Sequence, residues 1–231
     1  MSRYVVTGTN RGIGLEFVSQ LLAQGHQVVA TARNPQPVPA LQALANQYRT
    51  QLTLLPLDLA DESSVQIFAA EVGRQPIDVL INNAGVYGPR DAELGNLRGG
   101  DWAEVLWIDV IAPLLLTQAL LPALRQGTEK RIAFLSSKMG SIEDNTSGGS
   151  YVYRSAKTGL NQAVRSLAID LKDEGFVVLP LHPGWVMTDM GGPGALIDTR
   201  TSVIGLLKSI QGCSVAESGK FLAYDGKHIP W

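Results

Sequence analysis

The chain has 231 residues, of which 45% are hydrophobic and 17% charged, a composition that excludes a disordered chain and indicates a folded globular protein. The formal net charge of −2 gives no general electrostatic basis for binding nucleic acid or an anionic membrane. The one cysteine, Cys213, cannot form an internal disulfide, and the first ten residues lack the long apolar stretch of a signal peptide, so we expect a cytoplasmic protein.

Short β-rich segments alternate with segments of helical apolar spacing along the whole chain. The expected strands are residues 3–7, 27–32, 52–57, 77–81, 131–135, 176–181 and 220–222. The expected helices are a first one that ends at Gly25, followed by residues 38–48, 63–72, 102–125, 151–174 and 202–210. This alternation predicts a single α/β domain over residues 1–231, a Rossmann-type doubly wound parallel sheet of about seven strands flanked by helices.

The most apolar segment lies around Leu114–Leu116. Pro113, Gln118 and Pro122 are expected to interrupt it well short of the length that a membrane span needs. We therefore expect no membrane-embedded part.

Three glycines, Gly8, Gly12 and Gly14, lie between the first strand and the first helix. Glycines at such a turn let the backbone approach a pyrophosphate, and the helix N-terminus offers free N–H groups. Glycines alone could make only a tight turn, but the strand before and the helix after favour a dinucleotide site. The residues expected to contact the cofactor here are Gly8, Asn10, Arg11, Gly12, Ile13 and Gly14.

The end of the second strand carries Arg33, where NAD sites usually carry an acidic residue for the ribose 2′-hydroxyl. Guanidinium groups of Arg11 and Arg33 at this place would suit a 2′-phosphate, because arginine presents planar, bidentate donors. Both could instead be solvated surface arginines. The pattern favours NADP(H) and counts against the further alternative, an enzyme that oxidises alcohols with NAD.

Tyr153 and Lys157 lie four residues apart on the expected helix 151–174, so their side chains share one face. A free tyrosine titrates near pH 10, and a nearby ammonium favours the phenolate. We therefore expect Lys157 to lower the pKa of Tyr153 toward the working range of an acid–base group. The spacing alone is weak evidence, since a surface tyrosine and lysine can share a helix face.

Five ordered motifs together resemble the short-chain dehydrogenase/reductase family. The glycine turn has the family's TGxxxGIG spacing, and four more segments follow between the expected elements: Asn82-Asn83-Ala84-Gly85, Ser136-Ser137-Lys138-Met139-Gly140, Tyr153 with Lys157, and Pro183-Gly184-Trp185-Val186-Met187-Thr188-Asp189-Met190. Within the family, the segment around Pro183 and the C-terminal sequence are similar to the C-factor/Sniffer-type carbonyl reductase branch.

The resemblance implies roles for these residues. Ser137 would hydrogen-bond the substrate carbonyl, Tyr153 would act as acid–base, and Lys157 would hold the nicotinamide ribose. Asp58, next to Leu59, would hold the adenine amino group. The remaining implied cofactor contacts are Asn83, Ala84 and Gly85 on the adenosine side, and Pro183, Gly184, Val186 and Thr188 on the nicotinamide side.

One position departs from the family. The helix before the fifth strand usually carries an asparagine that kinks it and holds a water linked to the lysine, whereas this chain has Asp109. Aspartate is nearly isosteric and keeps the backbone carbonyl, so the water could survive. A carboxylate near Lys157 would also stabilise the ammonium. Asp109 is therefore either part of the catalytic group or purely structural.

We expect an NADPH-dependent oxidoreductase that reduces an aldehyde, ketone or quinone, with no metal. Residues 86–100 and 191–199 should wall the substrate pocket, with candidate apolar contacts at Tyr87, Trp185, Met187, Met190 and Leu196. The alternative is a C-factor-like signalling protein that binds nucleotide with little turnover. By the resemblance, the expected helices 102–125 and 151–174 form the surface of a homodimer or homotetramer.

Overall fold

The computed structural model describes residues 1–36 and 38–231, which form one parallel sheet of seven strands. The strand order is β3-β2-β1-β4-β5-β6-β7, and each neighbouring pair is parallel. The strands are β1 (Arg3–Val6), β2 (Gln27–Ala32), β3 (Leu52–Pro56), β4 (Val79–Asn82), β5 (Arg131–Leu135), β6 (Val177–His182) and β7 (Leu222–Ala223). The predicted doubly wound α/β fold is confirmed.

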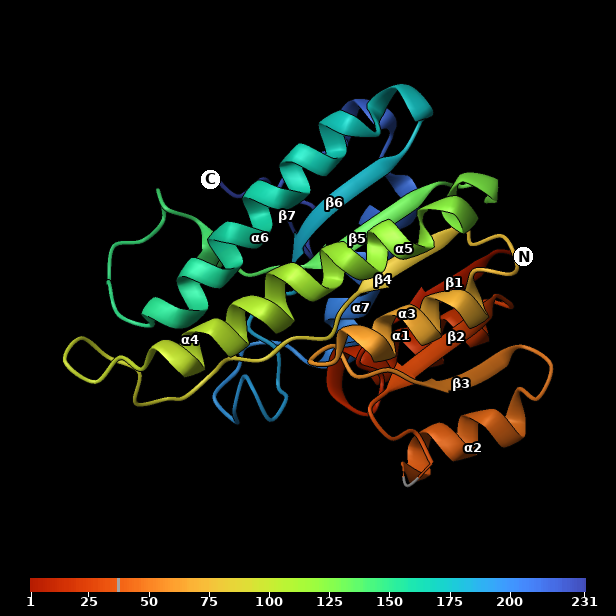
Figure 1. Cartoon of the computed structure of the whole chain (residues 1–231), viewed down its shortest axis with the longest axis horizontal. Helices are drawn as coiled ribbons and strands as arrows, with labels where there is room; N and C mark the ends of the chain where they lie inside the picture. The colour runs from red at the N-terminus through yellow and green to blue at the C-terminus, as the bar shows by residue number, and fades with distance from the viewer. Residues whose placement is uncertain (37) are drawn as a thin grey trace.

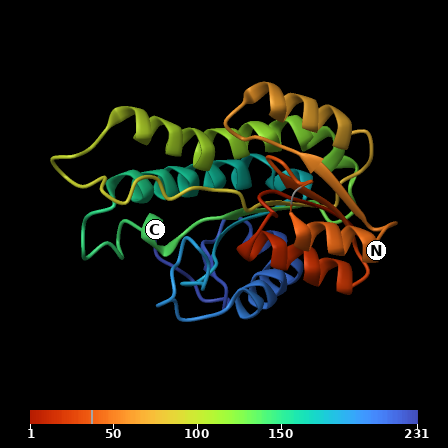
Figure 2. The same cartoon turned by 90° about the horizontal axis from the view of Figure 1, so that it is seen from below.

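Helices cover both faces of this sheet (Figures 1 and 2). One face packs against α1 (Gly12–Ala23), α2 (Pro39–Gln47) and α7 (Thr199–Gly212). The other face packs against α3 (Glu62–Val72), α5 (Ala112–Gln126) and α6 (Tyr151–Asp170). α4 (Gly99–Leu106) packs against α6 in a separate small cluster that contains Val105, Val152 and Ala156. Two apolar clusters, one on each face, form the core because strands buried on both faces carry apolar side chains in both directions.

The site is positioned by the point at which the strand order reverses. β1 lies between β2 and β4, so the connections that leave β1 and β4 run to opposite sides. In open parallel sheets a crevice forms at the carboxyl ends of such strands. The turn that starts at Gly8 follows β1, and the segment from Asn83 to Gly85 follows β4, so both meet at this crevice.

The expected helix 102–125 is not a single α-helix. A π-helical turn, Trp107–Ile111, joins α4 to α5 without a break. Such turns insert one extra residue and are frequent at functional sites. Asp109 lies in this turn and is buried, so the local change of geometry brings a carboxylate into the interior.

The prolines do not interrupt this helical run, contrary to the expectation from the sequence. Pro113 is the second residue of α5, directly after the π-helical turn, and Pro122 lies within α5. Among the described residues, the helical run 99–126 is long and apolar enough to cross a membrane, with a mean hydropathy of 1.8 in an 18-residue window. Core helices share that property, and this one buries Leu116, Leu120 and Leu124 against the sheet.

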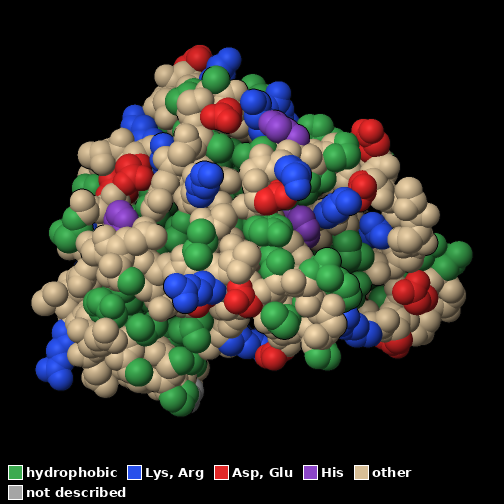
Figure 3. All heavy atoms as spheres, turned by 180° about the vertical axis from the view of Figure 1, so that it is seen from behind, with side chains coloured by type: hydrophobic (Ala, Val, Ile, Leu, Met, Phe, Trp, Pro, Cys, Tyr) green, Lys and Arg blue, Asp and Glu red, His purple; other side chains and the backbone are tan. Residues whose placement is uncertain are grey.

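Charged side chains of both signs are scattered over the face seen in Figure 3, with no large area of a single sign.

The other differences from the expected elements concern where helices and strands begin or end. α6 stops at Asp170, and Lys172–Glu174 forms a separate 3₁₀ turn. Ile77 precedes β4, because its N–H donates to the carbonyl of Ala123 and not to a neighbouring strand.

Candidate active site

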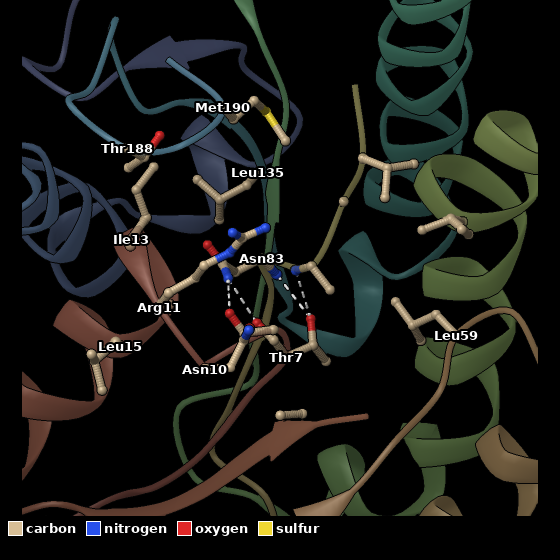
Figure 4. Close-up of a pocket in the computed structure, with 18 of the residues that line it drawn as sticks. Thr7, Asn10, Arg11, Ile13, Leu15, Leu59, Asn83, Leu135, Thr188 and Met190 are labelled. Carbon is tan, nitrogen blue, oxygen red and sulfur yellow. Dashed lines mark hydrogen bonds between the residues drawn. The ribbon is translucent and has the colours of Figure 1, made fainter. Parts of the chain in front are cut away.

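A cavity of about 920 Å³ opens at the carboxyl ends of β1 and β4 (Figure 4). It gathers residues from every predicted motif: Gly8, Asn10, Arg11, Gly12, Ile13, Gly14, Arg33, Asp58, Leu59, Asn83, Ala84, Gly85, Asp109, Tyr153, Lys157, Pro183 and Thr188. Among the described residues, Ser137, Gly184 and Val186 are predicted site residues that do not line it; Ser136 and Pro183, their neighbours, do. The cavity therefore runs from the glycine turn to the Tyr153 helix.

The glycine turn leaves no room for side chains. Gly8 and Gly12 have φ angles of +69° and +57°, which favour glycine. A Cβ added to Gly14 would lie 2.1 Å from the carbonyl oxygen of Gly8. These close contacts let β1, the segment after β4 and the N-terminus of α1 pack tightly at the cavity, where the free N–H groups of a helix N-terminus fit a pyrophosphate.

Asn83 ties the segment after β4 to this turn (Figure 4). Its Nδ2 donates to the carbonyl oxygens of Thr7 at 2.8 Å and Gly8 at 3.1 Å. The Thr7 hydroxyl accepts hydrogen bonds from the N–H groups of Asn83 and Ala84, both at 3.0 Å. Thr7 was not among the predicted site residues, although it is the last residue of the expected first strand.

Arg11 and Arg33 both line the cavity. The contact of the Arg11 guanidinium is an ion pair with Asp189, in the segment after β6, and both side chains are largely exposed. Sequence reasoning did not predict this partner, because it gave Asp189 no role. The ion pair links the two sides of the cavity mouth. To bind a phosphate, the Arg11 guanidinium must either break this ion pair or contact Asp189 and the phosphate at the same time.

Asp58 follows β3 at the cavity wall. Its carboxylate accepts a hydrogen bond from the Ala60 N–H at 2.9 Å, and its own N–H donates to the Ser64 hydroxyl at 2.9 Å. The Trp107 indole donates to the carbonyl of Leu59 at 2.9 Å, which joins this loop to the π-helical turn.

The predicted catalytic side chains converge between β5 and α6. Tyr153 and Lys157 are buried on one face of α6, with Lys157 Nζ 5.6 Å from the centre of the tyrosine ring. Lys157 Nζ also donates to the carbonyl of Leu135, the last residue of β5, at 3.1 Å. Ser137 is buried just beyond β5, and its hydroxyl accepts from the Met139 N–H at 3.1 Å.

Asp109 forms a buried ion pair with Lys157. Lys157 Nζ lies 2.9 Å from Asp109 Oδ2, and the two side chains are 6% and 0% exposed. Asp109 Oδ1 accepts from the Val86 N–H at 2.8 Å. Burial lowers the pKa of Lys157, but Asp109 and Tyr153 outweigh it and the net pKa is raised, so the ammonium is stabilised.

Lys157 lowers the pKa of Tyr153, as expected, but the net pKa of Tyr153 is raised above its ordinary value. Burial is the largest effect and raises the pKa of Tyr153. Lys157 and the Ser137 hydroxyl act in the opposite direction, whereas Asp109 adds to the increase. The physical reason is that burial of the phenol outweighs the charge of Lys157, and burial cannot be read from the sequence motif.

Asn161 is a further buried residue that sequence reasoning missed. Its Oδ1 accepts from the Ser136 hydroxyl at 2.6 Å, and its Nδ2 donates to the Gly140 carbonyl at 3.2 Å. It therefore holds the turn that contains Ser137. The available signal was its position, since Tyr153, Lys157 and Asn161 follow one another at intervals of four residues on one helix face.

Of the residues expected to form apolar contacts with the substrate, some line the cavity and others do not. Met187 and Met190 line the cavity, each about half exposed. Trp185 is half exposed, and its indole donates to the Gly191 carbonyl at 2.8 Å, which shapes the loop. Leu196 is 78% exposed and lies outside the cavity lining among the described residues. Tyr87 packs directly against Tyr153.

A glycine turn at the switch point of a parallel sheet, sharing its cavity with a buried tyrosine–lysine pair, defines a dinucleotide-binding oxidoreductase. The chain belongs to the short chain dehydrogenase family, whose sequence profile matches residues 3–194. The family resemblance inferred from the motifs is thereby confirmed.

Two relatives illustrate the range of the family. The C-signal protein of Myxococcus xanthus is 49% identical over 167 residues, which cover 72% of this chain and all of that protein. The 1-hydroxy-2-glutathionyl-2-methyl-3-butene dehydrogenase of Rhodococcus sp. (strain AD45) is 30% identical over 238 residues, which cover all of both chains.

Solved structures of carbonyl reductases match the whole chain. The carbonyl reductase Sniffer of D. melanogaster superimposes with a TM-score of 0.95 at 33% identity and covers 100% of both chains. The NADPH-bound carbonyl reductase from chicken fatty liver has a TM-score of 0.93 at 37% identity and covers 100% of this chain and 99% of its own.

Proposed function

We propose that this oxidoreductase reduces the carbonyl group of an aldehyde, ketone or quinone to an alcohol at the expense of NADPH. The observation that carries the proposal is the buried Tyr153–Lys157 pair in the same cavity as the glycine turn. The likeness to carbonyl reductases, one of them NADPH-bound, supports the choice of reaction and cofactor.

The residues present fit a dinucleotide, because the glycine turn packs tightly against the segment after β4 and places the N-terminus of α1 at the cavity, where a pyrophosphate can bind. When bound, NADPH supplies the hydride. Ser137 and Tyr153 donate hydrogen bonds to the carbonyl oxygen, where negative charge develops, and Tyr153 gives up its proton to the alkoxide. Lys157, kept protonated beside Asp109, stabilises the phenolate that this step leaves.

The preference for NADPH over NADH rests on Arg11 and Arg33 at the cavity wall. Fluorescence titration with each cofactor tests it. We expect NADPH to bind at least about tenfold more tightly, a difference of about 1.4 kcal/mol. Equal affinities would remove both arginines from the phosphate role and leave the reductase proposal standing.

The reaction itself is tested by following the absorbance of NADPH with a panel of uncharged aldehydes, ketones and quinones. Mass spectrometry of the product should show the addition of two hydrogen atoms. A protein that binds NADPH and oxidises it with none of these carbonyls would contradict the proposal.

A second candidate is a signalling role with little turnover, favoured by the 49% identity to the C-signal protein. The buried Tyr153–Lys157–Asp109 group argues against it, because a protein that only binds nucleotide has no use for a proton donor. Cofactor binding without carbonyl reduction would favour this candidate.

We also propose a homodimer or homotetramer that acts in the cytoplasm. The assembly surface would be the outer faces of the α4–α5 run and α6, where Ile111 and Ile169 are 42% and 58% exposed. The free thiol of Cys213, in a chain with one cysteine, supports the cytoplasmic location.

A further inference from the structure

Tyr87 stacks on the tyrosine that is proposed to donate the proton. The ring centroids of Tyr87 and Tyr153 are 4.6 Å apart, with 27° between the ring planes. The Tyr87 hydroxyl is 2.9 Å from the Ser150 hydroxyl, immediately before α6. Tyr87 therefore holds both the ring of Tyr153 and the start of the helix that carries it.

The segment directly before α6 has an unusual backbone conformation that the contact with Tyr87 can stabilise. Gly148 and Gly149 have φ angles of +65° and +64°, and Ser150 continues this left-handed backbone with a φ angle of +48°. A residue other than glycine is uncommon in this conformation. Because Tyr153 lies only three residues further on, the contact between Tyr87 and Ser150 fixes the origin from which the phenol is presented.

Arg90 lies over the same Tyr87 ring. Its guanidinium carbon is 4.7 Å from the ring centre, within the range of a cation–π contact. Its Nη2 donates to the carbonyl of Met190 at 2.7 Å. Met190 lies on the wall of the cavity (Figure 4), so the stack of Arg90, Tyr87 and Tyr153 joins the proton donor to the loop beside the substrate.

We propose that Tyr87 is a positioning residue for Tyr153, and that Arg90 makes this position depend on the placement of the loop that contains Met190. The inference rests on the proposed reductase function. A ring stacked on the phenol restricts its rotation and excludes water from that face. Because Arg90 already donates to the Met190 carbonyl, a displacement of this loop would also move the ring that holds the proton donor.

The test compares Tyr87→Leu with Tyr87→Phe, and uses Tyr151→Leu as the matched control, since Tyr151 is a half-exposed tyrosine two residues before Tyr153. Tyr87→Leu removes the stack, and we expect kcat to fall about tenfold, the upper range for an aromatic pair. Tyr87→Phe keeps the stack and should stay within about threefold of wild type. NADPH affinity should be unchanged in all three variants.

The pH profile separates positioning from a merely structural wall. Lys157, Asp109, Ser137 and Tyr87 are the groups that act on Tyr153, and burial is what raises its pKa most. Tyr87→Leu admits water to the phenol, so the alkaline limb of kcat should move to lower pH. Tyr87→Phe keeps the burial and removes only the smallest of these effects, so its limb should move less than that of Tyr87→Leu.

Unchanged kcat and an unchanged pH profile in Tyr87→Leu would overturn the inference. If Tyr87→Leu does not fold, Arg90→Gln takes its place, because this side chain is exposed. It should lower kcat about threefold at unchanged NADPH affinity, and no effect would overturn the inference.

Failure of the proposed function has a different signature, which is a wild-type protein that binds NADPH and reduces no carbonyl. The inference can then be read without turnover. The alkaline absorbance titration of Tyr153, obtained as the difference between each protein and its Tyr153→Phe counterpart, should shift to lower pH in Tyr87→Leu. No shift would overturn the positioning role.

Discussion

At the scale of single residues, the main feature is a tyrosine and a lysine buried together with a carboxylate. Asp109 stands where the family usually has asparagine, and its Oδ2 lies 2.9 Å from Lys157 Nζ. The pair keeps the ammonium charged but offsets its field at Tyr153. A charged Lys157 therefore lowers the pKa of the phenol less than a lysine without such a partner would.

We expect Asp109→Asn to move the alkaline limb of kcat to lower pH. Asp109 is one of the groups that raise the pKa of Tyr153, so its removal lowers that pKa. Carbonyl reduction uses the protonated phenol, and the rate falls as the pH rises through its pKa. The measurement is kcat against pH at saturating NADPH. A limb that stays in place or moves to higher pH would contradict this assignment.

His182, the last residue of β6, should make the stability depend on pH. Burial, followed by Lys138, lowers its pKa to about 4, and its Nδ1 has no hydrogen-bond partner among the described residues. An unfolded histidine titrates near 6.5, so between these values the unfolded chain binds a proton that the folded chain does not. The histidine thus costs no stability above pH 6.5 and progressively more as the pH falls toward 4.

From pH 7.5 to 5.0 we expect this histidine to lower the free energy of unfolding by about 2 kcal/mol. Urea unfolding of the wild type and His182→Gln at both pH values measures it, because the substitution removes this titration and leaves the others. Equal pH dependence in the two proteins would show that His182 does not contribute.

At the scale of elements, the glycine turn joins β1 to α1 by contacts that only glycine permits. Alanine normally favours a helix over glycine by about 1 kcal/mol. Gly14 lies inside α1, yet its added Cβ would meet the Gly8 carbonyl oxygen at 2.1 Å. Backbone must move to accommodate it, and the cofactor cradle moves with it.

We expect Gly14→Ala to lower the free energy of unfolding by about 1–3 kcal/mol and to weaken NADPH binding more than tenfold. Gly212→Ala is the matched control, because Gly212 also lies in a helix and a Cβ there meets nothing within 4 Å. Urea unfolding and cofactor fluorescence measure both. A Gly14→Ala protein that behaves like Gly212→Ala would contradict the close packing of the turn.

Elements buried on both faces were the most predictable from sequence. β2 and β5 have the bounds that their apolar runs indicated, Gln27–Ala32 and Arg131–Leu135. The π-helical turn was not predictable, because one extra residue hardly changes the apolar spacing of a long helix. The net pKa shift of Tyr153 and the Arg90 contact were also missed, since both depend on burial and on neighbours distant in sequence.

At the scale of the whole molecule, one sheet brings a cofactor cradle and a proton donor to the same edge. The inner side of the helical run 99–126 contributes Asp109, which pairs with Lys157 at this edge. Its outer side leaves apolar side chains such as Ile111 partly exposed. An exposed apolar helix surface is a common site of association.

We expect sedimentation to give a dimer or tetramer for the wild type. Ile111→Glu should shift it toward smaller species, because it places a charge on the proposed assembly surface. Ile67→Glu, on α3, is the matched control, since Ile67 is similarly apolar and more exposed. A monomeric wild type would contradict the proposed assembly.

The most direct measurement is the rate of carbonyl reduction by Tyr153→Phe at saturating NADPH, with Tyr151→Phe as the control. General acid catalysis typically contributes about 10²–10⁴ in rate. We expect Tyr153→Phe to lose at least about 100-fold in kcat while it binds NADPH with unchanged affinity, and Tyr151→Phe to lose little. A Tyr153→Phe protein that retains more than about a tenth of wild-type turnover would contradict the role of Tyr153 as the proton donor.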